Sequence, residues 1–241
     1  MALDTVTDFT DQRKSAIISL VNFSVSNACI HYRDKWFKMI EGLPTGASDS
    51  VALANIYVKW VLILFHRDKI ASTSSKYILS LFRFIDDLFG GWSGTRRQFD
   101  QFITTFNCFG LKYGIVFDKH QFGSSVSFLD VLVSNDCGTL VTDLYIKPTD
   151  ARRYLHRTSF HPSHAFHSIP FSQMRRAALI CSNDYLREFA INDMCKQFLA
   201  CGYNESCISK ARLKVSLLDR SLLLTEKKSL VPILTAPLFM F

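Results

Sequence analysis

The sequence lacks paired cysteines, a leader segment and a long uninterrupted run of apolar residues. Its seven cysteines are odd in number and no two have the Cys-x-x-Cys spacing, so we expect reduced thiols and no disulfide framework. Residues 1–10 contain two aspartates and no apolar segment, so we expect no secretory signal. The longest apolar stretch, Val51–Phe65, is interrupted by Asn55 and Lys59, and it predicts a buried helix instead of a membrane span.

The composition is that of a folded, basic chain. Of 241 residues, 48% are hydrophobic and 20% are charged, which predicts a packed core and excludes disorder throughout. Residues 1–141 carry 14 Lys and Arg against 13 Asp and Glu, a net +1, whereas residues 142–241 carry 14 against 8, a net +6. The local excess predicts a polyanionic partner for the C-terminal part, although charge alone does not separate nucleic acid from an acidic membrane.

Apolar periodicity, caps and turn residues predict a mixture of helices and strands. Thr10 or Asp8, Ser48 or Asp49, and Thr95 are the expected caps of the first three helices. Helices are expected over about 11–28, 50–65, 96–108, 172–181, 184–200 and 205–224. Strands are expected over 30–32, 36–39, 77–85, 88–92, 113–117, 126–133 and 140–147. Residues 151–170 are expected to be irregular, and the chain divides best near Asp150.

The most informative motif is Asp86-Asp87, which stands between two apolar runs that read as strands. Adjacent carboxylates repel and are costly to bury, so the pair must stay in water or bind a cation. At the tip of a hairpin they could serve Mg²⁺, and two such ions can stabilise the attacking and leaving oxygens of a phosphoryl transfer. The alternative is an ordinary Asp-Asp turn in a surface hairpin.

A second motif, Gly42-Leu43-Pro44-Thr45-Gly46, precedes the helix predicted to start near Val51. Its glycines permit close approach of the backbone to a ligand, and the N-terminus of the helix offers free N–H groups to an anion. The alternative is a plain loop before a capped core helix.

In this order, the two motifs resemble the palm of reverse transcriptases. Gly42–Tyr57 looks like motif B of that family, and Phe84-Ile85-Asp86-Asp87 looks like its motif C, Tyr/Phe-x-Asp-Asp. Further segments that resemble Penelope-like retroelement proteins and their relatives are motif D at 111–119, a Phe-Leu-Asp segment at 126–131, and the stretches 140–150 and 154–176. The ordered resemblance spans about residues 27–212.

The resemblance implies an α+β fold: a partial palm over 1–148, with an antiparallel sheet and packed helices, and a helical thumb over 149–241. It implies an RNA-directed DNA polymerase that transfers a nucleotide to a primer 3′-hydroxyl, with Mg²⁺ or Mn²⁺ at Asp86 and Asp87. Lys119, with Lys112 as a rival, would be the general acid. The residues implied to position nucleotide and template are Gly42, Pro44, Thr45, Gly46 and Phe84. The implied partners are an RNA template, a DNA primer and a deoxynucleoside triphosphate.

The basic segment after Asp150 is the predicted nucleic-acid surface. Residues 150–187 contain only two acidic side chains, and aromatic residues alternate with the arginines. The residues expected to contact phosphates are Lys147, Arg152, Arg153, Arg157, Arg175 and Arg176. The alternative is a solvated basic face over an aromatic core. Four histidines, His156, His161, His164 and His167, lack the spacing of a zinc site.

The first metal-binding aspartate of the family, in motif A, has no counterpart here. Only 41 residues precede Gly42, they look helical, and none of Asp4, Asp8 and Asp11 lies in a strand pattern. Thr45 stands where motif B often has Gln or Met, and Asp49 stands where motif B often has Pro. We therefore expect an N-terminally truncated palm, and a second chain that supplies fingers and motif A. The alternative function is a catalytically inactive nucleic-acid-binding fragment or a domesticated retroelement protein. The family and the reduced cysteines favour the nucleus or cytoplasm, with no membrane partner.

Overall fold

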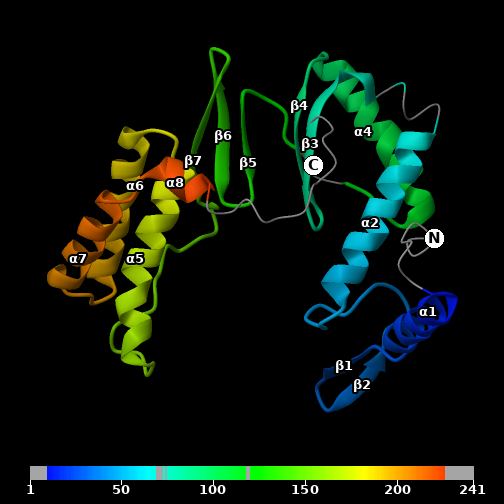
Figure 1. Cartoon of the computed structure of the whole chain (residues 1–241), viewed down its shortest axis with the longest axis horizontal. Coiled ribbons are helices and arrows are strands. Elements are labelled where there is room, and N and C mark those ends of the chain that lie inside the picture. The colour runs from blue at the N-terminus through cyan, green and yellow to red at the C-terminus, as the bar shows by residue number, and fades with distance from the viewer. Residues whose placement is uncertain (1–9, 69–72, 74, 118–119, 226–241) are drawn as a thin grey trace. The chain divides into compact units, whose positions relative to one another are not determined.

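The computed structural model describes residues 10–68, 73, 75–117 and 120–225. Helices alternate with small antiparallel sheets, which confirms the predicted α+β class (Figure 1). Residues 10–117 belong to one compact unit and residues 120–225 to another.

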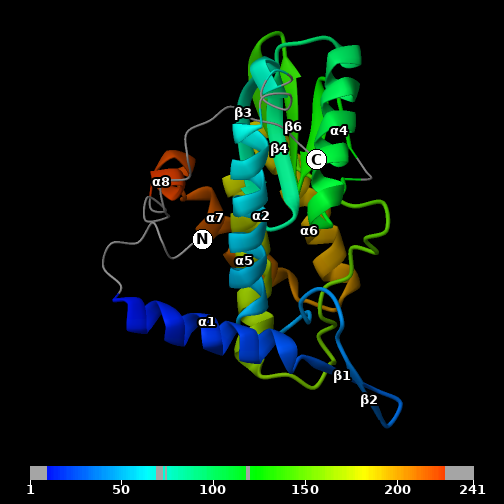
Figure 2. The same ribbon diagram turned by 90° about the vertical axis from the view of Figure 1, so that its right-hand side faces the viewer.

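The first unit begins with a helix followed by a hairpin (Figure 2). α1 spans Asp11–Ser26, and the side chain of its predicted cap, Thr10, accepts a hydrogen bond from the Arg13 N–H at 3.4 Å. β1 (Cys29–Tyr32) pairs with β2 (Lys35–Lys38) through a turn at Arg33 and Asp34, as predicted. α1 buries none of its residues, so its apolar stripe is not part of a core among the described residues.

Two helices and a second hairpin form the centre of this unit. α2 (Ser50–Arg67) and α4 (Arg96–Gly110) meet through Phe65, whose ring lies 4.6 Å from that of Phe106 and 5.8 Å from that of Phe102. After η1 (Ser75–Tyr77), β3 (Ile78–Phe84) and β4 (Asp87–Trp92) pair antiparallel. Trp92 also contacts Phe102, at 5.5 Å, so the hairpin shares the phenylalanine core of the helices.

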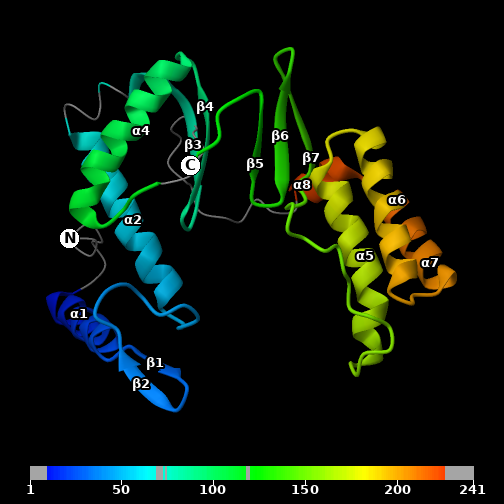
Figure 3. The ribbon, with the colours of Figure 1, turned by 180° about the vertical axis from the view of Figure 1, so that it is seen from behind.

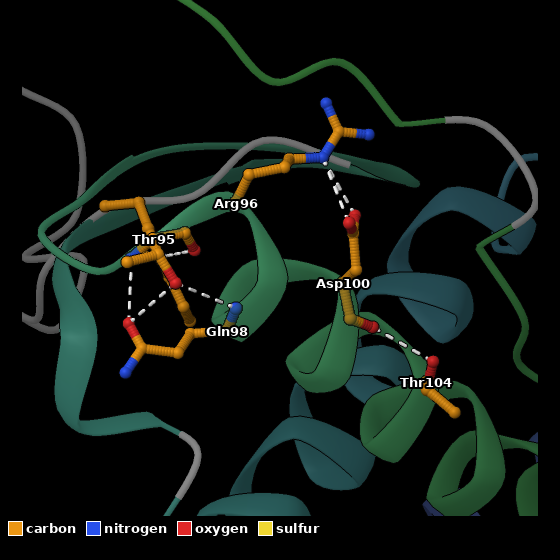
Figure 4. Close-up of polar contacts among 6 residues, drawn as sticks. Thr95, Arg96, Gln98, Asp100 and Thr104 are labelled. Atoms are coloured by element: carbon orange, nitrogen blue, oxygen red, sulfur yellow. Dashed lines mark hydrogen bonds and ion pairs between the residues drawn. The ribbon is translucent and has the colours of Figure 1, made fainter.

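α4 starts at the predicted cap, Thr95 (Figure 4). The Thr95 hydroxyl accepts from the Gln98 N–H at 3.3 Å, and the Thr95 N–H donates to the Gln98 side chain at 2.8 Å, which completes a capping box. Arg96, the first residue of α4, forms an ion pair with Asp100, one turn further along, at 2.9 Å.

The predicted strand over 113–117 is wrong. The chain forms η2 (Leu111–Tyr113) and then turns at Gly114, which has a φ of +66°. The Asn107 side chain takes the place of a partner strand: its carbonyl accepts from the Phe117 N–H and its amide donates to the Phe117 carbonyl, both at 2.9 Å.

The second unit begins with a three-stranded antiparallel sheet in the order β5-β6-β7. Its strands are β5 (Ser125–Phe128), β6 (Val131–Asp136) and β7 (Thr139–Leu144). The single strand expected over 126–133 is therefore wrong. Leu129 has a φ of +56°, which turns the chain so that Phe128 pairs with Val131.

Helices complete the second unit (Figure 3). They are α5 (Ser163–Ile180), α6 (Asp184–Ala200), α7 (Glu205–Ser216) and α8 (Arg220–Thr225). α6 lies where the sequence predicts it. The prediction of irregular chain to residue 170 fails for Ser163–Pro170, because a helix continues through the buried Pro170. Pro170 has no backbone N–H to donate within the helix, but the burial of its ring offsets the lost hydrogen bond. The last predicted helix divides into α7 and α8.

The two units divide before β5 and not near Asp150. Hydrogen bonds attach β7 to the end of α5: the Thr142 hydroxyl donates to the Ile180 carbonyl at 2.6 Å, and the Ser182 N–H donates to the Thr142 carbonyl at 2.9 Å. Leu144 packs on the helical core. Among the described residues, no helix is long and apolar enough to cross a membrane.

Candidate active site and nucleic-acid interface

The Asp86-Asp87 pair lies at the tip of the β3–β4 hairpin. Phe84 pairs with Asp87 across the strands, so Ile85 and Asp86 are the two residues of the turn. Both aspartates are exposed. Phe84 stands beside them with 53% of its surface exposed. The tip therefore presents carboxylate oxygens to solvent, where a hydrated cation can reach them.

Ile85 holds the turn in a conformation that β-branched residues avoid. Its φ is +54°, in the left-handed region, where a residue of this kind costs on the order of 1–3 kcal/mol. Such strain persists only where surrounding contacts determine the conformation, and it is concentrated at functional sites.

Arg83 supplies those contacts. Its guanidinium donates to the carbonyl of Ile85 at 2.7 Å and to the carbonyl of Asn55 in α2 at 3.2 Å. Partial burial lowers the pKa of Arg83 from its ordinary value. The hairpin tip is thereby attached to a fixed point in the N-terminal half of α2. In the sequence, the only signal of this role is that Arg83 is the single charged residue of β3.

The predicted nucleotide loop leads directly into the same helix. Gly42 and Gly46 have φ values of +83° and +95°, which suit glycine. The Pro44 carbonyl accepts from the Ser50 hydroxyl at 2.7 Å, which fixes the loop to the first residue of α2, and Thr45 is exposed. The loop thus contacts the first residue of α2, and Arg83 links the Asp86 turn to Asn55 in the same half of that helix.

Asp49 is the N-cap residue of α2, as predicted, but its side chain makes no capping hydrogen bond. Its carboxylate instead accepts from the Ser24 hydroxyl of α1 at 2.5 Å. The first N–H groups of α2 are therefore without a side-chain cap from Asp49, which suits an anion-binding role.

The candidate metal ligands at the tip are the carboxylates of Asp86 and Asp87. Among the described residues, no group of three or more His, Cys, Asp or Glu side chains could hold a metal ion. Two exposed carboxylates fit Mg²⁺, an ion that keeps several waters and takes other oxygens from substrate phosphates. Lys119, the proposed general acid, lies outside the described residues. Asp11 lies in the first turn of α1, beside Lys14, and so not in a strand.

The predicted phosphate-binding residues all lie in the second unit, and they differ in exposure and in the groups that they contact. Arg152 forms an ion pair with Asp193 at 2.6 Å, and Arg176 forms one with Asp130 at 2.5 Å. Lys147 and Arg153 are exposed, and Arg175 is half-buried in α5. Arg157 lies over the ring of Phe166 at 4.7 Å. The neutralising carboxylates lie 41 and 46 residues away in the sequence, so no local pattern indicates these ion pairs.

One family model matches the chain. Residues 153–212, which include α5, α6 and most of α7, match an animal helix-turn-helix domain. Comparison with curated proteins and with solved structures gives no match.

Proposed function

We propose that the chain is a reverse transcriptase-like protein of the Penelope-like kind, which carries out RNA-directed DNA synthesis. The observation that carries the proposal is the turn of strained Ile85 and exposed Asp86, which Arg83 attaches to the helix that follows the glycine loop. The ordered motifs of the sequence support the assignment, and the α+β class is compatible with it.

In this proposal, Asp86 is the direct ligand of Mg²⁺ or Mn²⁺ and Asp87 is its neighbour. The bound ions would stabilise the negative charge that develops as the primer 3′ oxygen bonds to the α-phosphorus and pyrophosphate leaves. Arg83 and Ile85 are positioning residues, because they fix where the carboxylates stand relative to α2. The loop from Gly42 to Gly46 would approach the nucleotide through its backbone.

The second unit would bind the template–primer duplex. Two features support this role: the helix-turn-helix match over 153–212, and the charge of +6 over 142–241. Exposed Lys147 and Arg153 can contact phosphates directly. Arg152 and Arg176 must first exchange their carboxylate partners, so we expect them to contribute less.

Primer extension tests the catalytic proposal. The full chain is incubated with a DNA primer on an RNA template, deoxynucleoside triphosphates and Mg²⁺. Two carboxylates leave part of the metal shell to substrate and water, so we expect slow extension. Asp86→Asn should reduce it at least about 100-fold. Asp34→Asn is the matched control, because Asp34 is an exposed aspartate in the turn of the other hairpin of this unit. Loss of activity in both variants, or in neither, would contradict the proposal.

The second candidate is a nucleic-acid-binding protein without catalysis, and the helix-turn-helix match favours it specifically. Its signature is duplex binding by the wild-type chain without extension, with affinity unchanged by Asp86→Asn. A gel-shift titration run beside the extension assay separates the two candidates.

A further inference from the structure

The second unit contains a cavity of about 230 Å³ between the 157 segment, α5 and α7. Its size is below the range typical of sites for drug-sized ligands, which suits a small ion or one group of a larger molecule. Four of its lining residues are basic: Arg157, His167, Lys210 and Lys214. No aspartate or glutamate lines it.

The cations of this cavity lack the carboxylate partners that several arginines of the unit have. Within the described residues, Arg157, Lys210 and Lys214 form no ion pair. By contrast, ion pairs are formed by Arg152, Arg176, Arg187 and Arg212. The cavity therefore concentrates positive charge without an internal counter-charge, which favours an anion.

Arg157 is held in place before any ligand arrives. Its backbone N–H donates to the Cys201 carbonyl at 2.9 Å, and its guanidinium lies 4.7 Å from the centre of the Phe166 ring. A side chain at Gly202 would meet the Arg157 Cβ at 3.4 Å, so the turn after α6 packs closely against this residue. A preorganised cation loses little freedom on binding.

Tyr203 gives an independent sign of a ligand. It lines the same cavity, only 3% of its surface is exposed, and its hydroxyl has no hydrogen-bond partner among the described residues. A buried hydroxyl without a partner is costly, and in native structures such a group calls for a ligand, a water or an ion. An anion oxygen in the cavity would accept its proton.

The N-terminus of α7 completes the site. Asn204 is the N-cap residue, its side chain makes no capping hydrogen bond, and Asn204 and Ser206 both line the cavity. The Cys207 and Ile208 N–H groups already donate to the Asn204 carbonyl, so the Glu205 and Ser206 N–H groups and the helix dipole favour an anion there. Lys210 and Lys214 follow at intervals of four residues and so share one face of α7.

We propose that this cavity binds a phosphate group, which is either a phosphate of a polynucleotide or free orthophosphate. A tetrahedral anion can accept from Arg157, Lys210, the Tyr203 hydroxyl and the Ser206 N–H, all of which line the cavity. The pocket does not require polymerase activity; the assignment of its phosphate to a polynucleotide rests on the proposed function.

Titration of the full chain with sodium phosphate tests the pocket, with the amide resonances of Ser206 and Cys207 as the readout and sodium chloride of equal ionic strength as the reference. We expect saturable shifts with phosphate only. Lys210→Gln should weaken binding by about tenfold, and Tyr203→Phe by several fold. Lys196→Gln, an exposed lysine of α6 outside the cavity, should leave binding unchanged. Absence of saturation in the wild-type chain, or equal effects of Lys196→Gln and Lys210→Gln, would overturn the proposal.

A competition experiment identifies the source of the phosphate. A labelled RNA–DNA duplex is bound to the chain, and orthophosphate is added at constant ionic strength. Displacement that Lys210→Gln reduces assigns the pocket to a polynucleotide phosphate. Saturable phosphate binding without displacement assigns it to the free ion. Either result is independent of primer extension, so failure of the pocket and failure of the polymerase proposal are distinguishable.

Discussion

At the scale of single residues, Arg83 is the side chain on which the geometry of the aspartate turn depends most. It joins the carbonyl of a strained turn residue to a backbone carbonyl of α2. A tight turn could be predicted here from local turn chemistry, but the prediction placed it at Asp86-Asp87, one residue after the observed turn at Ile85-Asp86. The role of Arg83 could not be predicted, because Asn55 is 28 residues away and only the fold brings it near.

Arg83→Met should lower the free energy of unfolding of the first unit by about 1–2 kcal/mol, because two hydrogen bonds from a charged donor are lost at a half-buried site. Urea denaturation monitored by tryptophan fluorescence measures it, since Trp36, Trp60 and Trp92 all lie in this unit. Arg97→Met, an exposed arginine of α4, is the control and should change little. Equal effects of the two variants would argue against a bracing role.

Cys181 makes stability depend on pH. Burial, with a hydrogen bond to Asp143 at 3.4 Å, raises the pKa of its thiol from about 9 to about 11. Below pH 9 the thiol is protonated in both states and its contribution is complete. Between pH 9 and 11 only the unfolded thiol ionises, so this contribution, about 2–3 kcal/mol, is lost as pH rises.

Chemical denaturation at several pH values tests this assignment. Cys181→Ala should flatten the alkaline fall in unfolding free energy, whereas Cys137→Ala, at an exposed thiol, should retain it. The same steep fall in both variants would show that another group is responsible.

At the scale of elements, local signals were sufficient where a cap or a turn decides the structure. Thr95 and Gln98 form their box within four residues, and Arg33-Asp34 closes a hairpin through backbone geometry alone. Predictions failed where a distant contact decides. Asn107 replaces a strand partner for Phe117, and burial of Pro170 lets α5 start at Ser163.

Thr95→Ala should destabilise the first unit by about 1 kcal/mol, because the first N–H groups of α4 lose their acceptor. Tryptophan fluorescence in urea reports the change. Thr104→Ala serves as the control, since its exposed hydroxyl only donates to the Asp100 carbonyl within the helix, and alanine is the better helix former. A larger loss in Thr104→Ala than in Thr95→Ala would contradict the assignment of the cap.

At the scale of the whole molecule, the sequence predicted the α+β class and the concentration of positive charge in the C-terminal part. It misplaced the division of the chain, because strands and helices on both sides of Asp150 share one core through β7 and α5. It also overestimated the free positive charge, since Asp130 and Asp193 pair with two of the predicted phosphate-binding arginines only after folding.

Duplex binding should therefore weaken with salt, and the exposed cations should contribute most. Arg153→Gln is expected to reduce the slope of log K against log salt by about one, because one phosphate contact is lost. Lys35→Gln, in the exposed hairpin of the first unit, should leave the slope unchanged. Fluorescence anisotropy over a range of potassium chloride concentrations provides both slopes, and a fall of the same size in Lys35→Gln would indicate diffuse charge attraction instead of a defined surface.

The central claim is that the Ile85-Asp86 turn holds a divalent cation, and Fe²⁺-mediated hydroxyl-radical cleavage of the chain tests it most directly. With Fe²⁺ in place of Mg²⁺, the account predicts backbone cleavage centred on residues 84–88. Mg²⁺ should suppress that cleavage, Asp86→Asn should abolish it, and Asp34→Asn should leave it intact. Absence of cleavage at this turn, or cleavage that Asp86→Asn does not alter, would contradict the account.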